Sequence, residues 1–263
     1  MRSTSTRPRR RLAIALGGVA ALCLSALALP LLPSLAGPGP SESRSDGRLH
    51  PVGDGALPER APELRSVDAP LSVAERGYAI HLAQQAMPDD ATDVLGFPGG
   101  EVLAADLPPI EDRGPGRRAS VSLYDYTSDR LHQTLVDLAA SSVLRSRDVR
   151  DLQLPPSIAE TTIATQVALT ADPTPAFVEQ YRRVTGSALI AAEQVRAVAG
   201  VWSSADDAAP VGPTKDCGTD RCLRLLLALP SGQYLDTSDF AVDLSSRTVL
   251  PVTPVEPEQP HEH

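Results

Sequence analysis

The sequence predicts an α+β fold of two tandem units, each a helix packed on an antiparallel meander. Two capping boxes each open a segment with helical apolar spacing, and alternating strand patterns separated by turn residues follow each of them. The boxes are Ser72-Val73-Ala74-Glu75 and Ser157-Ile158-Ala159-Glu160. A strand–turn–strand string also recurs: Val136-Asp137-Leu138 and Val242-Asp243-Leu244 are each followed, after four residues, by a Val-Leu pair. Together these observations indicate duplication of one unit.

Composition narrows the class of protein. The chain has 263 residues, of which 42% are hydrophobic and 3% aromatic, a balance that excludes a coiled coil, a polytopic membrane protein and a wholly disordered chain. Five of its 24 basic residues and none of its 33 acidic residues precede Gly37, so the remainder carries a net charge of −14. Such a negative surface repels phosphate backbones, which excludes nucleic acid as the expected partner.

Residues 1–36 are predicted to be a signal peptide or membrane anchor. Arg7-Pro8-Arg9-Arg10-Arg11 is followed by an uncharged stretch, Leu12 to Leu29, and small residues precede Gly37 as at a cleavage site. The paired arginines resemble a bacterial twin-arginine (Tat) export signal. Cleavage and retention both remain open, because 18 apolar residues just span a bilayer. In either case we expect an extracytoplasmic protein, secreted or anchored, that meets the membrane only through residues 12–36 if uncleaved.

The first unit is predicted to cover residues 67–155, after a disordered linker at residues 37–66 that is rich in Pro, Gly and Ser. Order is expected to begin near Leu71, and the helix opened by Ser72 to be stopped by Pro88. The strands predicted here are Glu101 to Leu107, Arg118 to Tyr124, Leu131 to Leu138, and one that begins at Val143-Leu144.

The second unit is predicted to cover residues 156–252, because Pro155-Pro156 marks a boundary between the two units. Its first helix runs to about Leu169, and a second is expected to start at Asp172-Pro173 and to end at Gly186. Phe177, Tyr181 and Val184 are placed on one face of that second helix. The predicted strands are Val195 to Trp202, Cys222 to Leu229, Gln233 to Leu244 and Thr248 to Val252. Residues 253–263, proline-rich and acidic, are expected to be a disordered tail.

One stretch of the first unit resembles the copper amine oxidases: Arg117-Arg118-Ala119-Ser120-Val121-Ser122-Leu123-Tyr124-Asp125, followed by Val136-Asp137-Leu138. It is similar to the first of two small domains that precede the catalytic domain in that family. Val201-Trp202-Ser203-Ser204, Arg221 to Leu229 and Val242-Asp243-Leu244 look like the second such domain. The resemblance covers about Leu71 to Val252 and implies two cystatin-like domains of accessory type.

The motifs for amine oxidase chemistry are not matched. Leu123-Tyr124-Asp125-Tyr126 imitates the topaquinone motif, but a leucine stands where the family has asparagine, and the string is placed at a hairpin turn. His261-Glu262-His263 has the His-x-His spacing of the family's copper ligands, yet it lies in the tail without a third ligand nearby. We therefore expect a non-enzyme with no catalytic, cofactor-binding or metal-binding residues and no cofactor.

The cysteines and the histidines are further candidates for a functional role. Cys217 and Cys222 are predicted to form a disulfide, because no other cysteine remains once the signal is removed and an exported protein meets oxidising conditions. A redox or metal-binding pair is the alternative. A Ser128, His132 and Asp129 or Asp137 triad can be drawn, but we expect His132 to be a strand residue with its side chain in solvent. His81 is expected to be a surface or boundary residue of the first helix.

The sequence therefore predicts a non-catalytic, exported or membrane-anchored protein for binding or assembly, with an unknown protein partner in the envelope or extracellular space. Two alternatives stay open. One is an accessory chain for an amine oxidase whose copper and quinone come from another chain. The other is a small-molecule binder that uses the concave face of one sheet.

Overall fold

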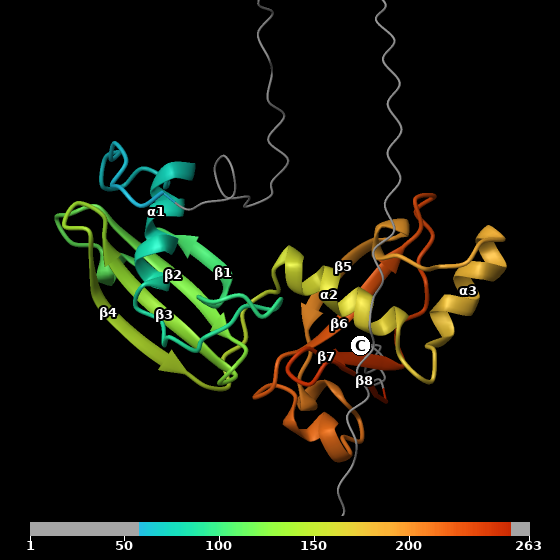
Figure 1. Cartoon of the computed structure of the whole chain (residues 1–263). Coiled ribbons are helices and arrows are strands. Elements are labelled where there is room, and N and C mark those ends of the chain that lie inside the picture. Colours follow the sequence, from blue (N-terminus) through green and yellow to red (C-terminus); the bar gives the residue numbers. More distant parts are fainter. Residues whose placement is uncertain (1–57, 254–263) are drawn as a thin grey trace, which may run out of the picture. The chain divides into compact units, whose positions relative to one another are not determined.

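The computed structural model of this chain describes residues 58–253. It is an α+β structure with two antiparallel four-stranded sheets and three α-helices (Figure 1). Residues 1–57 and 254–263 are outside the described part, and with them the predicted signal or anchor, most of the linker, and the tail. Within residues 58–253, none of the helices has both the length and the apolar character needed to cross a bilayer.

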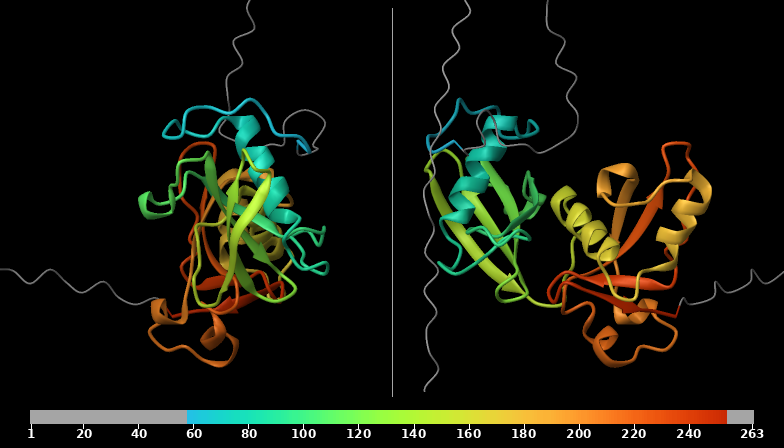
Figure 2. Two further views of the ribbon diagram at one scale, coloured as in Figure 1. Left: turned by 90° about the vertical axis from the view of Figure 1, so that its left-hand side faces the viewer. Right: turned by 45° about the vertical axis from the view of Figure 1, so that its right-hand side comes forward.

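The first sheet has the order β1-β2-β3-β4 and is an uninterrupted meander. Its strands are β1 (Glu101–Asp106), β2 (Arg118–Asp125), β3 (Arg130–Asp137) and β4 (Ser142–Val149). Helix α1 (Val73–Gln84) contacts all four strands and covers one face, as Figures 1 and 2 show. Apolar residues alternate on that face: Ala119, Val121 and Leu123 of β2 are fully buried beneath α1. The strand pattern read from the sequence is confirmed for all four strands.

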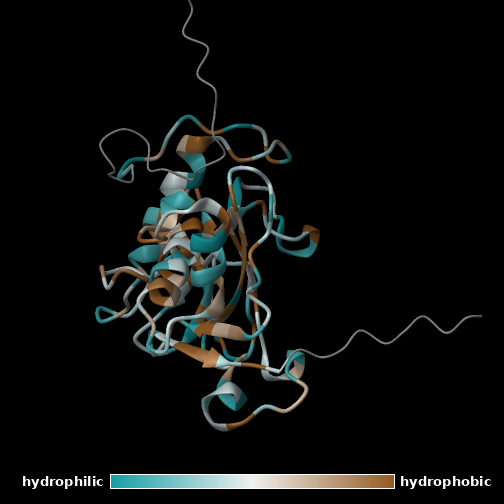
Figure 3. Cartoon of the chain, turned by 90° about the vertical axis from the view of Figure 1, so that its right-hand side faces the viewer, coloured by the Kyte–Doolittle hydropathy of each residue, from teal (hydrophilic) through white to brown (hydrophobic). Residues whose placement is uncertain are grey.

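The second sheet repeats this meander with the order β5-β6-β7-β8. Its strands are β5 (Arg196–Val201), β6 (Cys222–Ala228), β7 (Phe240–Asp243) and β8 (Thr248–Pro251). Helix α2 (Ile158–Leu169) packs on all four strands. Helix α3 (Ala176–Thr185) buries Phe177 and Tyr181 in the same core. In Figure 3 the helices carry both hydrophilic and hydrophobic residues, as expected for elements with one buried side.

Two predicted boundaries and one predicted burial are wrong. Helix α3 begins at Ala176 with Pro175 as its N-cap, rather than at Asp172, although Gly186 ends it in the left-handed conformation as expected. Val184 is 44% exposed instead of joining the buried face. The strand expected from Gln233 shrinks to β7, because this stretch first forms a turn and a single bridge from Tyr234 to Ala228.

The two sheets repeat one arrangement in their strand register. Arg118 pairs with Asp137 in the first sheet, and Cys222 pairs with Asp243 in the second. Both Val-Asp-Leu strings therefore end the third strand of their sheet, as predicted. In each case the aspartate carboxylate accepts hydrogen bonds from the two backbone amides that open the following turn, which closes the turn in the same way twice.

Candidate functional site

Each half of the described chain contains a buried glutamate–arginine pair at the start of its first helix. In the first half Ser72 Oγ accepts a hydrogen bond from the Glu75 amide, and Glu75 Oε2 accepts one from the Ser72 amide at 2.7 Å. Arg117, the residue before β2, then donates to both carboxylate oxygens of Glu75 at 2.8 and 3.0 Å. Both side chains are almost fully buried, so the capping box also anchors the second strand.

The rest of the Arg117 guanidinium holds the segment that leads into α1. It donates to the carbonyl oxygens of Ser66, Val67, Ala69 and Pro70 at 2.6 to 3.2 Å. Leu64 packs against the same core. The end of the predicted linker therefore takes part in the first half of the fold, a role that its composition did not indicate.

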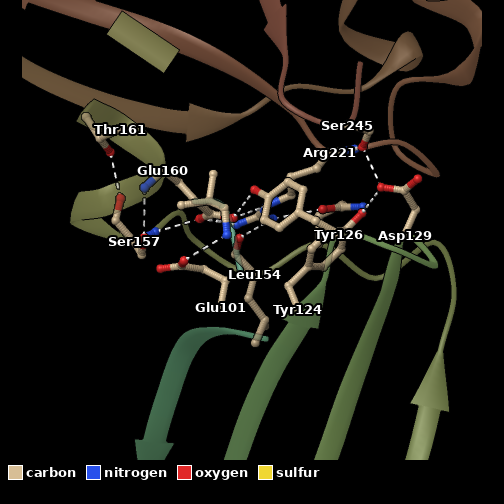
Figure 4. A network of polar contacts seen from close by, with 12 residues as sticks. Glu101, Tyr124, Tyr126, Asp129, Leu154, Ser157, Glu160, Thr161, Arg221 and Ser245 are labelled. Carbon is tan, nitrogen blue, oxygen red and sulfur yellow. Dashed lines mark hydrogen bonds and ion pairs between the residues drawn. The ribbon is translucent and has the colours of Figure 1, made fainter. Parts of the chain in front are cut away.

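The second half repeats this arrangement around Glu160 (Figure 4). Ser157 and Glu160 form the reciprocal capping box, and Arg221, the residue before β6, donates to both oxygens of Glu160 at 2.9 Å. Arg221 also donates to Gln153 Oε1 and to the Leu154 carbonyl, each at 2.8 Å. Both side chains of the ion pair are fully buried.

The two pairs differ in the third donor to the carboxylate. Glu75 Oε1 accepts from the Arg65 backbone amide at 2.9 Å, within its own half. Glu160 Oε1 accepts instead from the Tyr126 hydroxyl at 2.6 Å, from the turn after β2. The Arg221 guanidinium lies over the Tyr124 ring, 5.3 Å from its centroid, in a cation–π contact. The Tyr-Asp-Tyr string therefore contributes to the polar core of the second half.

Further contacts join the two halves next to these tyrosines. Asp129, in a left-handed turn conformation, accepts hydrogen bonds from Tyr124 Oη at 3.3 Å and from Ser245 Oγ at 2.5 Å. Arg247 donates to the Val94 carbonyl, and the Val94 side chain is fully buried in the core that α2 covers. Ser245 and Arg247 belong to the turn after the second Val-Asp-Leu string.

The pKa of Glu75 in the first half and the pKa of Tyr126 beside the second pair shift in opposite directions. Burial alone would raise the pKa of Glu75, but hydrogen bonds from Arg117 and from the Ser72 and Arg65 amides lower it to about 2. Burial raises the pKa of Tyr126, and the Glu160 carboxylate beside its hydroxyl raises it further. Burial likewise raises the pKa of Glu101 and of Asp129, helped by neighbouring carboxylates. The phenols are thereby held protonated, as hydrogen-bond donors.

The predicted disulfide between Cys217 and Cys222 is present. Both cysteines are buried in a small cluster with Trp202, Ala241 and Leu250. This cluster lies where the long segment between β5 and β6 returns to the sheet. The bond therefore fastens that segment at the point where β6 begins.

The prediction that His132 points into solvent is wrong. Its side chain is 5% exposed, and its Nδ1 lies 2.8 Å from Asp148 Oδ1 on the neighbouring strand β4. The carboxylate that contacts His132 is therefore that of Asp148 and not that of Asp129 or Asp137. His132 and Asp148 are register partners, and directly opposite residues on neighbouring strands have adjacent side chains. Ser128 donates to Asp125 at 2.6 Å, so no Ser-His-Asp relay is assembled. His81, half-buried on α1, is a boundary residue as expected.

The His-x-His decoy, His261 and His263, lies outside the described residues. Within residues 58–253, no three His, Cys, Asp or Glu side chains are grouped so that they could hold a metal ion. Tyr124 and Tyr126, the other decoy, have carboxylates and an arginine as neighbours. The expectation of no catalytic and no cofactor residues remains a prediction.

Sequence reasoning missed both glutamate–arginine pairs. A signal was present, since each capping box ends in a glutamate and an arginine stands directly before the second strand of each unit. The partners are 42 and 61 residues apart, however, and only the packing of the helix on its sheet brings them together.

No protein-family model matches this chain, and no curated protein matches it. Among solved structures, the chain is similar to a copper-containing benzylamine oxidase from Hansenula polymorpha, with a TM-score of 0.43 and 15% sequence identity. The similarity covers 71% of this chain and 29% of the oxidase chain. The chain thus spans less than a third of the length of that oxidase, a member of the family that the sequence resembles.

Proposed function

We propose that this chain is a non-catalytic binding or assembly protein of copper amine oxidase accessory-domain type, exported or anchored in the membrane. The sequence resemblance from Leu71 to Val252 and the unmatched quinone and copper motifs support the type. The Cys217–Cys222 disulfide supports an oxidising, extracytoplasmic location. The buried Tyr124 and the half-buried Tyr126 support a structural use of the Tyr-Asp-Tyr string, because each hydroxyl donates to a carboxylate.

One observation carries the binding role: the outer face of the second sheet is only partly covered. The cluster of Trp202, the disulfide, Ala241 and Leu250 covers the part formed by β7, β8 and the start of β6. The remaining part, which we call the β5–β6 outer face, exposes Val198, Leu226 and Tyr234 by 62%, 49% and 60%.

These apolar side chains are neighbours on the sheet. Val198 and Leu226 are register partners, and Tyr234 bridges to Ala228, two residues along β6 from Leu226. Adjacent exposed apolar side chains on a sheet are typical of a surface that another chain covers. Strand β5 is also an edge of its sheet, so an extended segment could add to it by backbone hydrogen bonds.

Charge decides the kind of partner. Arg196 and Arg224 lie on the same face, opposite Ala228 and Gly200 in the register, and so flank the apolar residues. The chain beyond residue 36 carries 33 acidic against 19 basic residues, so a second copy would be repelled overall. The occupant we propose is an extended segment of a different protein that carries carboxylates beside apolar side chains.

The test uses the full chain in its own envelope, with a photo-crosslinking residue at position 226. We expect a discrete adduct with one other protein, and the crosslinked segment should be acidic. The same probe at position 144, an exposed leucine on β4 of the other sheet, is the matched control and should give no such adduct.

Reversing both flanking charges, by Arg196→Glu and Arg224→Glu, should lower the yield of the adduct at position 226 by roughly tenfold, since rim charges govern encounter. Circular dichroism should show unchanged folding. An adduct with a second copy of this chain, an adduct that ignores the charge reversal, or no adduct at all would each contradict the proposal.

A further inference from the structure

A hollow of about 400 Å³, lined mainly by polar and charged residues, lies on the first half. It is formed where three segments meet: the chain after α1, the turn between β2 and β3, and the paired ends of β3 and β4. The residues that line it are Pro88, Asp90, Asp125, Ser128, Arg130, His132, Asp148 and Arg150. This volume is at the lower end of the range for small-molecule sites.

His132 supplies the most specific group of this hollow. A carboxylate can only accept hydrogen bonds, so the contact with Asp148 places the ring proton on Nδ1. When the ring is neutral, this leaves Nε2 as an acceptor. It is buried and has no hydrogen-bond partner among the described residues. A buried polar atom without a hydrogen-bond partner is costly, so such an atom calls for a partner such as a water or a bound group.

The charges around His132 are of two kinds. The Asp125 carboxylate already accepts three hydrogen bonds, from the Thr92 amide and from the Thr127 amide and Ser128 hydroxyl of its own turn. Asp90 and Arg150 are both exposed, and neither side chain has a salt bridge within residues 58–253. The lining of the hollow thus includes a carboxylate and a guanidinium without salt bridges among the described residues, together with the unpartnered His132 Nε2.

We propose that this hollow binds a small zwitterion, of the size of an amino acid or dipeptide. Its ammonium group donates to His132 Nε2 and pairs with Asp90, while its carboxylate pairs with Arg150. A phosphate ester fits less well, because Asp90, Asp125 and Asp148 line the same hollow. A metal ion fits less well too, since no metal-holding group of side chains exists within the described residues.

The test is a titration of the full chain, labelled with nitrogen-15 in histidine, with glycine, alanine and glycylglycine as zwitterionic probes. Acetate and methylammonium, each carrying one of the two charges, are the controls. A zwitterion should shift the His132 ring signals, with its Nε2 signal moving in the direction of an accepted hydrogen bond. Each singly charged control should bind about tenfold more weakly, because it loses one charge-assisted contact.

Substitutions at two exposed residues test the rim of the hollow without removing buried contacts. Arg150→Gln and Asp90→Asn should each weaken zwitterion binding about three- to fivefold, the range for a solvent-exposed charge pair. Arg145→Gln on β4, the strand that ends just before Arg150, and Asp89→Asn beside Asp90 are the matched controls and should bind as the wild type does. The proposal is overturned if acetate or methylammonium binds as tightly as the zwitterions, if the rim variants behave like their controls, or if no probe moves the His132 signals at roughly 10 mM.

Discussion

The two halves of the described chain share a buried glutamate–arginine pair and differ in the third donor to its carboxylate. In both, a capping-box glutamate is buried with the arginine that precedes the second strand. In the first half a backbone amide completes the carboxylate's shell, so that half is closed on itself. In the second half a tyrosine from the first half completes it. The glutamate–arginine pair therefore holds the helix to the sheet within each half. In the second half, the third donor to the carboxylate also joins the two halves.

The turns after the two Val-Asp-Leu strings also differ in whether they contact the other half. In the second half this turn carries Ser245 and Arg247, which donate to Asp129 and to the Val94 carbonyl of the first half. In the first half the matching turn has Ala139, Ala140 and Ser141, all exposed. The contacts between the halves thus come from turn residues that differ between them, while the buried glutamate–arginine pair is the same in both.

The largest test of this comparison removes each arginine in turn. Arg117→Met and Arg221→Met should each lower the free energy of unfolding by about 3–5 kcal/mol, because a buried carboxylate loses its partner. Urea denaturation followed by circular dichroism measures the loss. The double variants Glu75→Gln/Arg117→Met and Glu160→Gln/Arg221→Met should recover part of it, since the uncompensated charge is removed. Losses below about 1 kcal/mol would show that the pairs do not organise their halves.

Acid should reveal the first pair through the pKa of Glu75. This pKa falls from 4.5 in the unfolded chain to about 2 in the folded one, so the group stabilises the fold above pH 4.5 and that stability disappears as the pH falls toward 2. The shift corresponds to about 3 kcal/mol. Unfolding free energies measured across this range should decline less in Glu75→Gln than in the wild type. Glu101 and Asp129, whose pKa values are raised, act with the opposite sign, since acid relieves their burial.

The disulfide has a counterpart in the first half that is made of hydrogen bonds. There, Arg118 donates to the Asp112 carbonyl and Arg113 to the Pro108 carbonyl, which ties down the segment before β2. Replacing Cys217 and Cys222 by serine should cost about 2 kcal/mol, the chain entropy of so short a loop. Thermal unfolding with and without reductant measures it. A reductant-insensitive wild-type melting temperature, or reactive thiols in the unreduced protein, would refute the structural role.

The smallest expected effect isolates the contact between the halves. Tyr126→Phe removes one donor from the Glu160 carboxylate and should cost about 1–2 kcal/mol, because Arg221 still binds that group. Tyr234→Phe, at an exposed hydroxyl, is the control and should change stability little. If the two variants are equally stable in urea, the Tyr126 hydroxyl contributes nothing to the stability of the fold.

Much of the fold was predictable because its signals are local. Both capping boxes form as predicted, and Gly186 ends α3 as the sequence indicates. The start of α3 was misplaced because Asp172-Pro173 and Pro175 offer competing entries to a helix. His132 was misplaced because an isolated strand pattern does not show which face a helix will cover.

The sequence by itself determined the two α+β units, their capping boxes and the pairing of the only two cysteines in the described chain, because neighbours in sequence create these features. Tertiary structure alone decided which arginine meets which glutamate, which aspartate meets His132, and that Tyr126 completes the shell of Glu160. These partners lie 16 to 61 residues apart, at positions set by helix packing and strand register. Their strength comes from burial, and burial exists only once the layers have packed.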